Sequence, residues 1–133
     1  MDLAYIVNQN PLNVDLSGDF LTGAEPFYKT IDGVANTDTS ILLPARLVKT
    51  HYLTYIHIIL SGAVAANNCV ITVKDGDSIR YKTLIPSTAP IGSDKTVSFV
   101  YPIAITTGSA LEVKATAAGA GAILTVNVGG YTL

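Results

Sequence analysis

The sequence predicts an all-β fold, an antiparallel β-sandwich of the jelly-roll type with about seven or eight strands. From about residue 46 onward, short runs rich in Val, Ile, Thr, Tyr and Phe alternate with clusters of Gly, Pro, Asn and Asp. This pattern is typical of an antiparallel sandwich or barrel. The longest run, residues 46–61, is rich in β-branched and aromatic residues and lacks the 3.6-residue spacing of a helix. Six strands after residue 45, with one or two before it, approach the eight strands of a jelly roll.

Residues 1–45 are predicted to form an irregular N-terminal arm with one or two short strands, and residues 46–133 the sandwich domain. Gly, Pro and Asn are spread through the arm, yet apolar side chains recur along it. A disordered tail would be poorer in such residues. We therefore expect the arm to dock on its own domain or on a neighbouring molecule. The candidate partner-binding anchors, each with the protein's own core as the alternative, are Tyr5, Ile6, Phe20, Phe27 and Tyr28.

Residues 46–61 are predicted to form one long central strand. Strict alternation places Leu53, Tyr55 and His57 on one face, with Tyr52 on the other. His51 and His57 are six residues apart, so alternation puts them on the same face, too far apart to share one metal or substrate atom. His51, near the polar start of the strand, is expected to be solvated. Tyr55 and His57 are candidates for an oligomer interface, with packing in the core of their own subunit as the alternative.

The remaining strands are delimited by turn residues. Gly76 supplies the positive φ angle of a tight hairpin in Asp-Gly-Asp-Ser, and the long loop at 86–95 fits a connection that crosses between two sheets. Pro102 is expected to stop a strand, and the Gly129-Gly130 pair to kink the chain end. The strands expected after the first are 69–74, 79–85, 96–101, 110–116 and 122–128.

Charged residues make up only 14 % of the chain, against about 25 % in an average soluble domain. This deficit indicates a surface partly covered by other copies or by a partner, unless Thr, Ser and Asn supply the polarity. The net charge of −2 argues against nucleic-acid binding, which needs a basic surface. No apolar run approaches 18 residues and no signal peptide is recognisable, so we expect no membrane span and synthesis in the cytoplasm.

The residues needed for catalysis are sparse, and we expect no enzyme, cofactor or metal site. The histidines are too far apart to cooperate, and the two glutamates, Glu25 and Glu112, lie in different predicted regions. Asp75 and Asp77 resemble part of a calcium loop, but a hairpin turn is the simpler interpretation because further oxygen ligands do not follow. Cys69, the only cysteine, is expected to be a small buried apolar residue.

The order of motifs from residue 69 to residue 131 resembles small jelly-roll virion proteins of tailed bacteriophages. The segments that carry the resemblance are C-V-I-T-V-K-D-G, I-R-Y-K-T-L-I-P, S-F-V-Y-P-I-A-I-T-T-G-S-A-L-E-V-K-A-T and I-L-T-V-N-V-G-G-Y. The most similar groups are capsid decoration (cement) proteins and head-fibre bases. The resemblance implies a homotrimer on the outer capsid surface of the virion, with an N-terminal arm that reaches over subunits of the major capsid protein.

An alternative function belongs to a different class. The chain could be a carbohydrate- or receptor-binding module of a phage tail or baseplate, or of a bacterial surface protein. Tyrosines clustered on one exposed face would favour this alternative, whereas clustering at a three-fold axis would favour the decoration protein.

Overall fold

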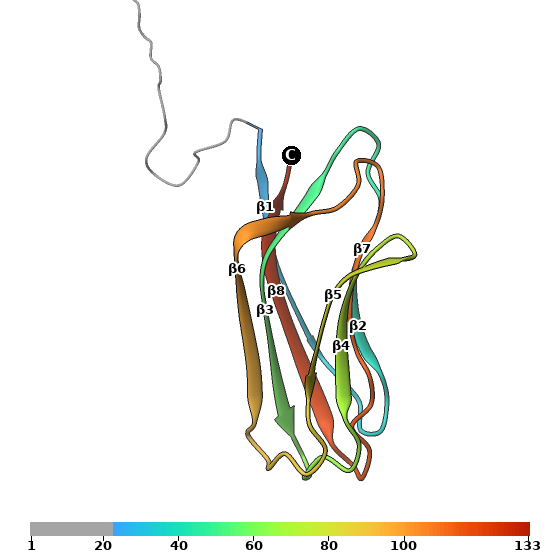
Figure 1. Ribbon diagram of the computed structural model, residues 1–133, viewed down its shortest axis with the longest axis vertical. Coiled ribbons are helices and arrows are strands. Elements are labelled where there is room, and N and C mark those ends of the chain that lie inside the picture. The colour runs from blue at the N-terminus through green and yellow to red at the C-terminus, as the bar shows by residue number, and fades with distance from the viewer. Residues whose placement is uncertain (1–22) are drawn as a thin grey trace, which may run out of the picture.

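The computed structural model describes residues 23–133, which form eight β-strands in two packed sheets (Figure 1). This confirms the predicted all-β sandwich. The described residues contain no helix, and therefore none long and apolar enough to cross a membrane. The strands are β1 (Glu25–Asp32), β2 (Thr39–Leu43), β3 (His51–Ser61), β4 (Cys69–Asp75), β5 (Ser78–Ile85), β6 (Asp94–Ala104), β7 (Leu111–Ala115) and β8 (Ile123–Thr132).

The strand order is that of a jelly roll. One sheet has the order β1-β8-β3-β6 and the other β2-β7-β4-β5. The first strand therefore pairs with the last, the second with the seventh, the third with the sixth and the fourth with the fifth, all antiparallel. Nested pairing of this kind results when one long antiparallel ribbon rolls up into two sheets. The loop between β5 and β6 crosses from one sheet to the other, as the sequence predicts.

Two of these strands come from the segment predicted as an arm. β1 is an outer strand of one sheet and β2 of the other, so the sandwich begins at Glu25 and not at Arg46. Phe27 lies in the core with only 7 % of its surface exposed, whereas its neighbour Tyr28 is 75 % exposed. The other three predicted anchors, Tyr5, Ile6 and Phe20, lie outside the described residues.

The core lies between the sheets and follows the alternation of the strands. Cys69, Ile71 and Val73 of β4 are completely buried, with half-buried residues between them. Burial raises the pKa of the Cys69 thiol to about 11, which leaves it protonated and unreactive at neutral pH. The prediction of a small buried apolar cysteine is confirmed.

A β-bulge at Thr54 overturns the predicted faces of β3. Leu53 and Tyr55 pair with the consecutive β8 residues Gly130 and Gly129, so Thr54 is one extra residue against β8. The pairing with β6 also shifts here, because residues 99–102 of β6 lie between the partners of Leu53 and Tyr55. Leu53 therefore points inward together with Ile56, although strict alternation placed these two residues on opposite faces. His51 is also turned inward, and it lies on the opposite face from His57. The Thr54 hydroxyl donates a hydrogen bond to the Gly129 carbonyl, 2.9 Å away, which holds the bulge against β8.

Two predicted strand ends are also wrong. β6 runs through Pro102 to Ala104, because β6 is an outer strand and a missing N–H is tolerated there. β8 runs through Gly129 and Gly130 to Thr132, and these glycines make room for aromatic rings instead of kinking the chain. Gly76 does adopt a positive φ of 58° in the hairpin between β4 and β5, as predicted.

Candidate binding surfaces

The outer face of the β1-β8-β3-β6 sheet is rich in tyrosine, and we call it the tyrosine face. Residues directly opposite each other in neighbouring strands point to the same side of a sheet, so the pairing defines rows across this face. In the order β1, β8, β3, β6, the rows are Pro26, Tyr131, Tyr52 and Ala104; Tyr28, Gly129, Tyr55 and Ser98; Thr30, Asn127, His57 and Thr96; and Asp32, Thr125, Ile59 and Asp94.

The four tyrosines occupy the first two rows. The rings of Tyr52 and Tyr131 stack, with centroids 4.9 Å apart and planes 17° apart. Gly129 lies between Tyr28 and Tyr55 in its row, and the Tyr55 ring occupies the space that a Cβ at Gly129 would need. The glycine thus allows the Tyr55 ring to lie close to the strand, and the result is an aromatic surface near one end of the sheet.

Polar side chains in the next two rows form hydrogen bonds with one another. Thr30 donates to Asn127 over 2.7 Å, His57 Nε2 lies 3.0 Å from Asp94 Oδ2, and Thr125 donates to Asp32 over 3.1 Å. No position in the four rows holds Lys or Arg. The face therefore combines aromatic rings with hydroxyl, amide and carboxylate groups and carries no permanent positive charge.

The structure brings three of the predicted site residues together on this face. Tyr55 and His57, predicted for an oligomer interface, share it with Tyr28, predicted as an arm anchor. Tyr52 and Tyr131 also belong to this face, although the sequence pattern did not predict it. The available signal was the spacing of Leu53 and Ile56, two apolar residues separated by two positions, which breaks the alternation where the bulge occurs.

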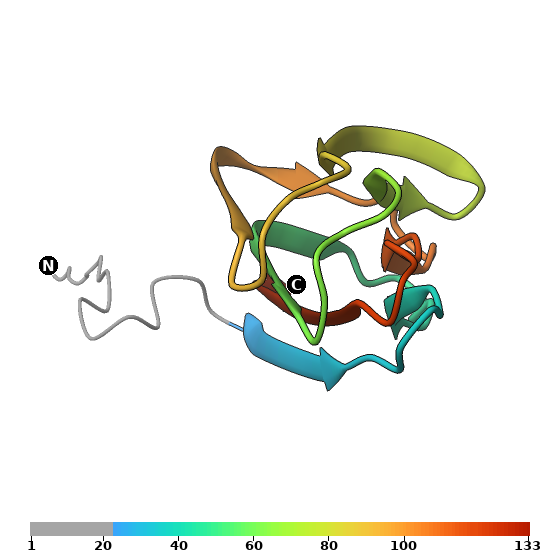
Figure 2. The same ribbon diagram turned by 90° about the horizontal axis from the view of Figure 1, so that it is seen from below.

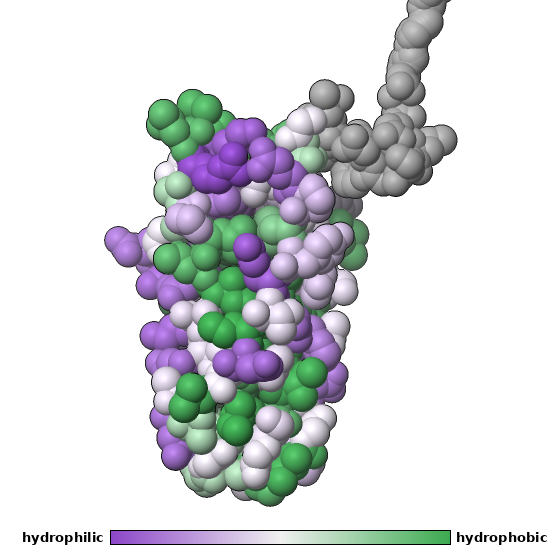
Figure 3. Space-filling view, turned by 180° about the vertical axis from the view of Figure 1, so that it is seen from behind, coloured by the Kyte–Doolittle hydropathy of each residue, from purple (hydrophilic) through white to green (hydrophobic). Residues whose placement is uncertain are grey.

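A second surface feature is a groove between the outer strands β1 and β2. Figure 2 shows these two strands on one side of the sandwich and β5 and β6 on the other. Figure 3 looks onto the β1 and β2 side, where apolar surface runs between hydrophilic patches. A cavity of about 220 Å³ opens here, smaller than the roughly 300–1,000 Å³ of small-molecule sites. Its apolar walls come from Pro26, Phe27, Leu42, Leu43 and Pro44.

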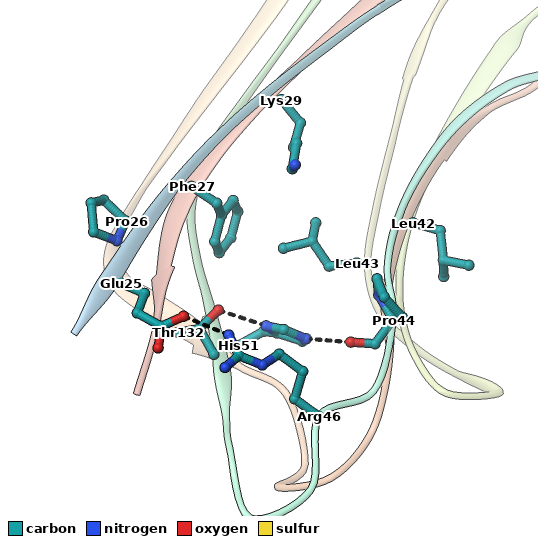
Figure 4. A pocket seen from close by; sticks show the side chains of 10 residues that line it. All are labelled: Glu25, Pro26, Phe27, Lys29, Leu42, Leu43, Pro44, Arg46, His51 and Thr132. Carbon is teal, nitrogen blue, oxygen red and sulfur yellow. Dashed lines mark hydrogen bonds and ion pairs between the residues drawn. The ribbon is translucent and has the colours of Figure 1, made fainter. Parts of the chain in front are cut away.

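His51 forms part of the groove wall and is buried, with 3 % of its surface exposed, which corrects the expectation that it is solvated. Its Nδ1 lies 2.8 Å from the Thr132 hydroxyl and its Nε2 lies 2.9 Å from the Pro44 carbonyl oxygen (Figure 4). The Phe27 ring meets the imidazole edge-on, with centroids 6.4 Å apart. With both nitrogens occupied, His51 serves to connect β3, β8 and the end of β2.

The rim of the groove is charged. Arg46 donates a hydrogen bond to Glu25, and Lys49 lies 3.6 Å from the same carboxylate. The hydrogen bond and charge of Arg46 lower the pKa of Glu25. Lys29 points into the opening (Figure 4), and no carboxylate of residues 23–133 forms an ion pair with it. Counting Glu25 against Lys29, Arg46 and Lys49, the rim has an excess of positive charge.

Asp75, considered above as part of a calcium loop, has hydrogen-bond partners within the protein. The Asp75 carboxylate accepts hydrogen bonds from the Thr106 amide, the Thr106 hydroxyl and Arg80, all at 2.8–3.0 Å. These bonds fasten the β4–β5 hairpin to the chain that follows β6. Within residues 23–133, no group of three or more His, Cys, Asp or Glu side chains is placed to hold a metal ion.

Comparison with known proteins identifies no relative by sequence: no family model and no curated protein matches the chain. Among solved structures, a ruminal GH26 endo-β-1,4-mannanase is similar over 71 % of this chain and 18 % of its own, with 12 % identity and a TM-score of 0.40. Latent PorU from Porphyromonas gingivalis is similar over 80 % of this chain and 13 % of its own, with 9 % identity and a TM-score of 0.45. This chain thus spans less than a fifth of either protein.

Viral proteins are also among the similar structures. The tobacco streak virus coat protein is similar over 80 % of this chain and 86 % of its own, with 9 % identity and a TM-score of 0.36. The structure of infectious bursal disease virus strain Gx is similar over 81 % of this chain and 31 % of that chain, with 14 % identity and a TM-score of 0.29. At such scores these likenesses decide nothing about function.

Proposed function

We propose that the protein is a non-catalytic virion structural protein, a decoration protein that binds the outer capsid of a tailed phage as a homotrimer and bridges its major capsid protein subunits. The observation that carries this proposal is the tyrosine face. Protein interfaces are enriched in Tyr and depleted of Lys and charged residues at their centres. A sheet face with four tyrosines and no Lys or Arg fits that composition and explains the low charge of the chain.

In this proposal the tyrosine face joins the subunits, and the N-terminal residues Tyr5, Ile6 and Phe20 reach the capsid. A trimer presents three such contacts on one rigid body. Once the first contact has formed, the others form at high effective concentration, so weak individual contacts combine into slow release. In this proposal the sandwich forms the rigid trimer, and the N-terminal segment makes the contacts with the capsid.

The first prediction concerns the mass in solution. Light scattering should give three times the chain mass of 13.9 kDa for the full chain and one chain mass for the double variant Tyr28→Ser/Tyr55→Ser. Tyr101→Ser is the matched control, because Tyr101 is 87 % exposed and belongs to none of the four rows, and it should stay trimeric. A monomeric full chain, or dissociation by the control as well, would contradict an interface on the tyrosine face.

The same face favours a second function, binding of a neutral glycan. Sugar rings pack their C–H groups on the electron-rich faces of aromatic rings, and their hydroxyls bond to amide and hydroxyl groups. Tyrosines next to Asn127, Thr30 and Thr125 offer both kinds of contact. The two carboxylates and the lack of Lys and Arg disfavour anionic glycans.

The second prediction tests the glycan directly. The chain has no Trp, so its intrinsic fluorescence comes from tyrosine and can report binding of soluble neutral polysaccharides. Tyr55→Ala should weaken binding about tenfold, equivalent to roughly 1.4 kcal/mol, and Tyr101→Ala should not change it. Heparin serves as the anionic comparison. A monomer that binds neutral polysaccharide through Tyr55 would favour the glycan-binding module over the decoration protein. If no polysaccharide binds, the glycan-binding function is wrong.

A further inference from the structure

The two sides of the sandwich where the sheets end, at β5 and β6 and at β1 and β2, differ in how well side chains cover them. On the β5 and β6 side, Tyr81 and Phe99 meet edge-on with ring centroids 5.1 Å apart and cover the core. On the β1 and β2 side, Phe27 is the only inward-facing residue of β1 that is buried. The next two inward positions, Lys29 and Ile31, are exposed although their partners in β8, Val128 and Val126, are fully buried. The core behind β1 is therefore buried, but the inward-facing side chains of Lys29 and Ile31 remain exposed along this side.

The outer edge of β1 is also free. β1 is eight residues long and pairs only with β8, so its other edge presents unpaired N–H and C=O groups within the described structure. Such an edge can accept a further strand, which gains main-chain hydrogen bonds and can bury alternate side chains. A strand beside β1 would place every second side chain over Ile31, Phe27 and Leu43.

The chain itself contains a segment with the matching pattern. Residues 12–17 read Leu-Asn-Val-Asp-Leu-Ser, so apolar and polar residues alternate with the period of a half-buried strand. Residues 1–22 contain Asp2, Asp15 and Asp19 and no Lys, Arg or His, whereas the groove rim has an excess of positive charge. Apolar pattern and charge thus both complement the groove.

Chain connectivity favours docking of residues 12–16 in the groove of their own chain over docking in the groove of a neighbouring copy. Residue 16 and Glu25 are separated by eight residues, which is enough for a loop, and Gly23 in this stretch has a φ of +81°. A nearby strand on the same chain has a millimolar effective concentration without any partner. We propose that residues 12–16 dock in the β1/β2 groove of their own chain as an extra strand antiparallel to β1, with Leu12, Val14 and Leu16 facing inward.

Disulfide trapping in the full chain tests this docking. Val14→Cys is combined in turn with Lys29→Cys and Ile31→Cys, the two exposed inward positions of β1, so that a register shift of two residues is covered. Asn13→Cys with the same partners is the matched control, because position 13 would face away from the groove. Cys69 does not compete, since it is fully buried and its thiol is protonated. All substituted positions of β1 are exposed, so the variants should fold.

Under mild oxidation at low protein concentration, one of the Val14→Cys pairs should form an internal disulfide at least about ten times faster than its Asn13→Cys control. Equal rates for the two positions would overturn the proposal, because they would indicate random encounters. Covalent dimers would also overturn it, since the segment would then come from a neighbouring chain. If neither position reacts, Pro26 and Lys29 alone protect this edge from pairing, and the proposal is wrong. The tyrosine-face prediction is unaffected by any of these results.

Discussion

Gly130→Ala is expected to lower the free energy of unfolding by about 4 kcal/mol or more, or to prevent folding altogether. Gly130 lies opposite Phe27 on one side and Leu53 on the other, on the inward face of β8. A Cβ at this position would overlap the Tyr52 carbonyl oxygen and would lie 2.7 Å from Phe27 Cζ. The carbonyl belongs to the backbone of a central strand and cannot rotate away, so the sheet itself would have to shift. Chemical denaturation with urea measures the loss.

Gly129→Ala is the matched control for this substitution. The added Cβ would meet the Tyr55 ring, which can turn toward solvent because it lies on the outer face. We expect a cost of about 1–2 kcal/mol, in the range of ordinary overpacking. Equal costs for the two glycines would contradict the tight packing of Gly130 against the β3 backbone. Because Gly129→Ala displaces Tyr55, it should also weaken whatever the tyrosine face binds.

Asp75→Asn is expected to lower the free energy of unfolding by about 2–3 kcal/mol at neutral pH. The Asp75 side chain is only 7 % exposed, and one of its oxygens accepts bonds from Arg80 and from both donors of Thr106. An amide oxygen of the same shape is a weaker acceptor and carries no charge for Arg80. Asp77→Asn, in the exposed turn two residues later, is the control and should change stability by less than about 0.5 kcal/mol.

The effect of Asp75→Asn should depend on pH in a defined direction. Burial raises the pKa of Asp75, but the Thr106 and Arg80 hydrogen bonds outweigh burial and lower it below its usual value of 3.8. A lowered pKa in the folded state means that the stabilisation is complete above the unfolded-state value and is lost as the pH falls through the folded-state value. The stability difference between the original protein and Asp75→Asn should therefore shrink as the solution is acidified below pH about 4. A difference that stays constant or grows would contradict the assignment.

Several elements could be predicted from the sequence because their signals are local. The alternation of Cys69, Ile71 and Val73 predicts the inward face of β4, and Gly76 predicts the hairpin that follows. Neither depends on which sheet β4 joins. The candidate surface was predicted only in part: Tyr55 and His57 were named as candidates for an oligomer interface, but Tyr52 was assigned to the opposite face.

The remainder depends on contacts between residues distant in the sequence. Thr54 forms a bulge because its hydroxyl bonds to the Gly129 carbonyl of β8, and that pairing cannot be recognised from residues near Thr54. The bulge decides that His51 is buried while His57 faces outward. The segment before residue 46 was harder to predict for the same reason. β1 has a single buried residue, Phe27, and β2 is only five residues long, so both are strands through their pairing with β8 and β7.

The sequence by itself therefore determined the fold class, the hairpins and the lack of charge, since these follow from local conformational preference and composition. Only the tertiary structure decided which tyrosines share a face, because cross-strand register and one extra residue at Thr54 set the direction of each side chain. It also decided that a groove lies between β1 and β2, since a groove between two sheets exists only once both have formed.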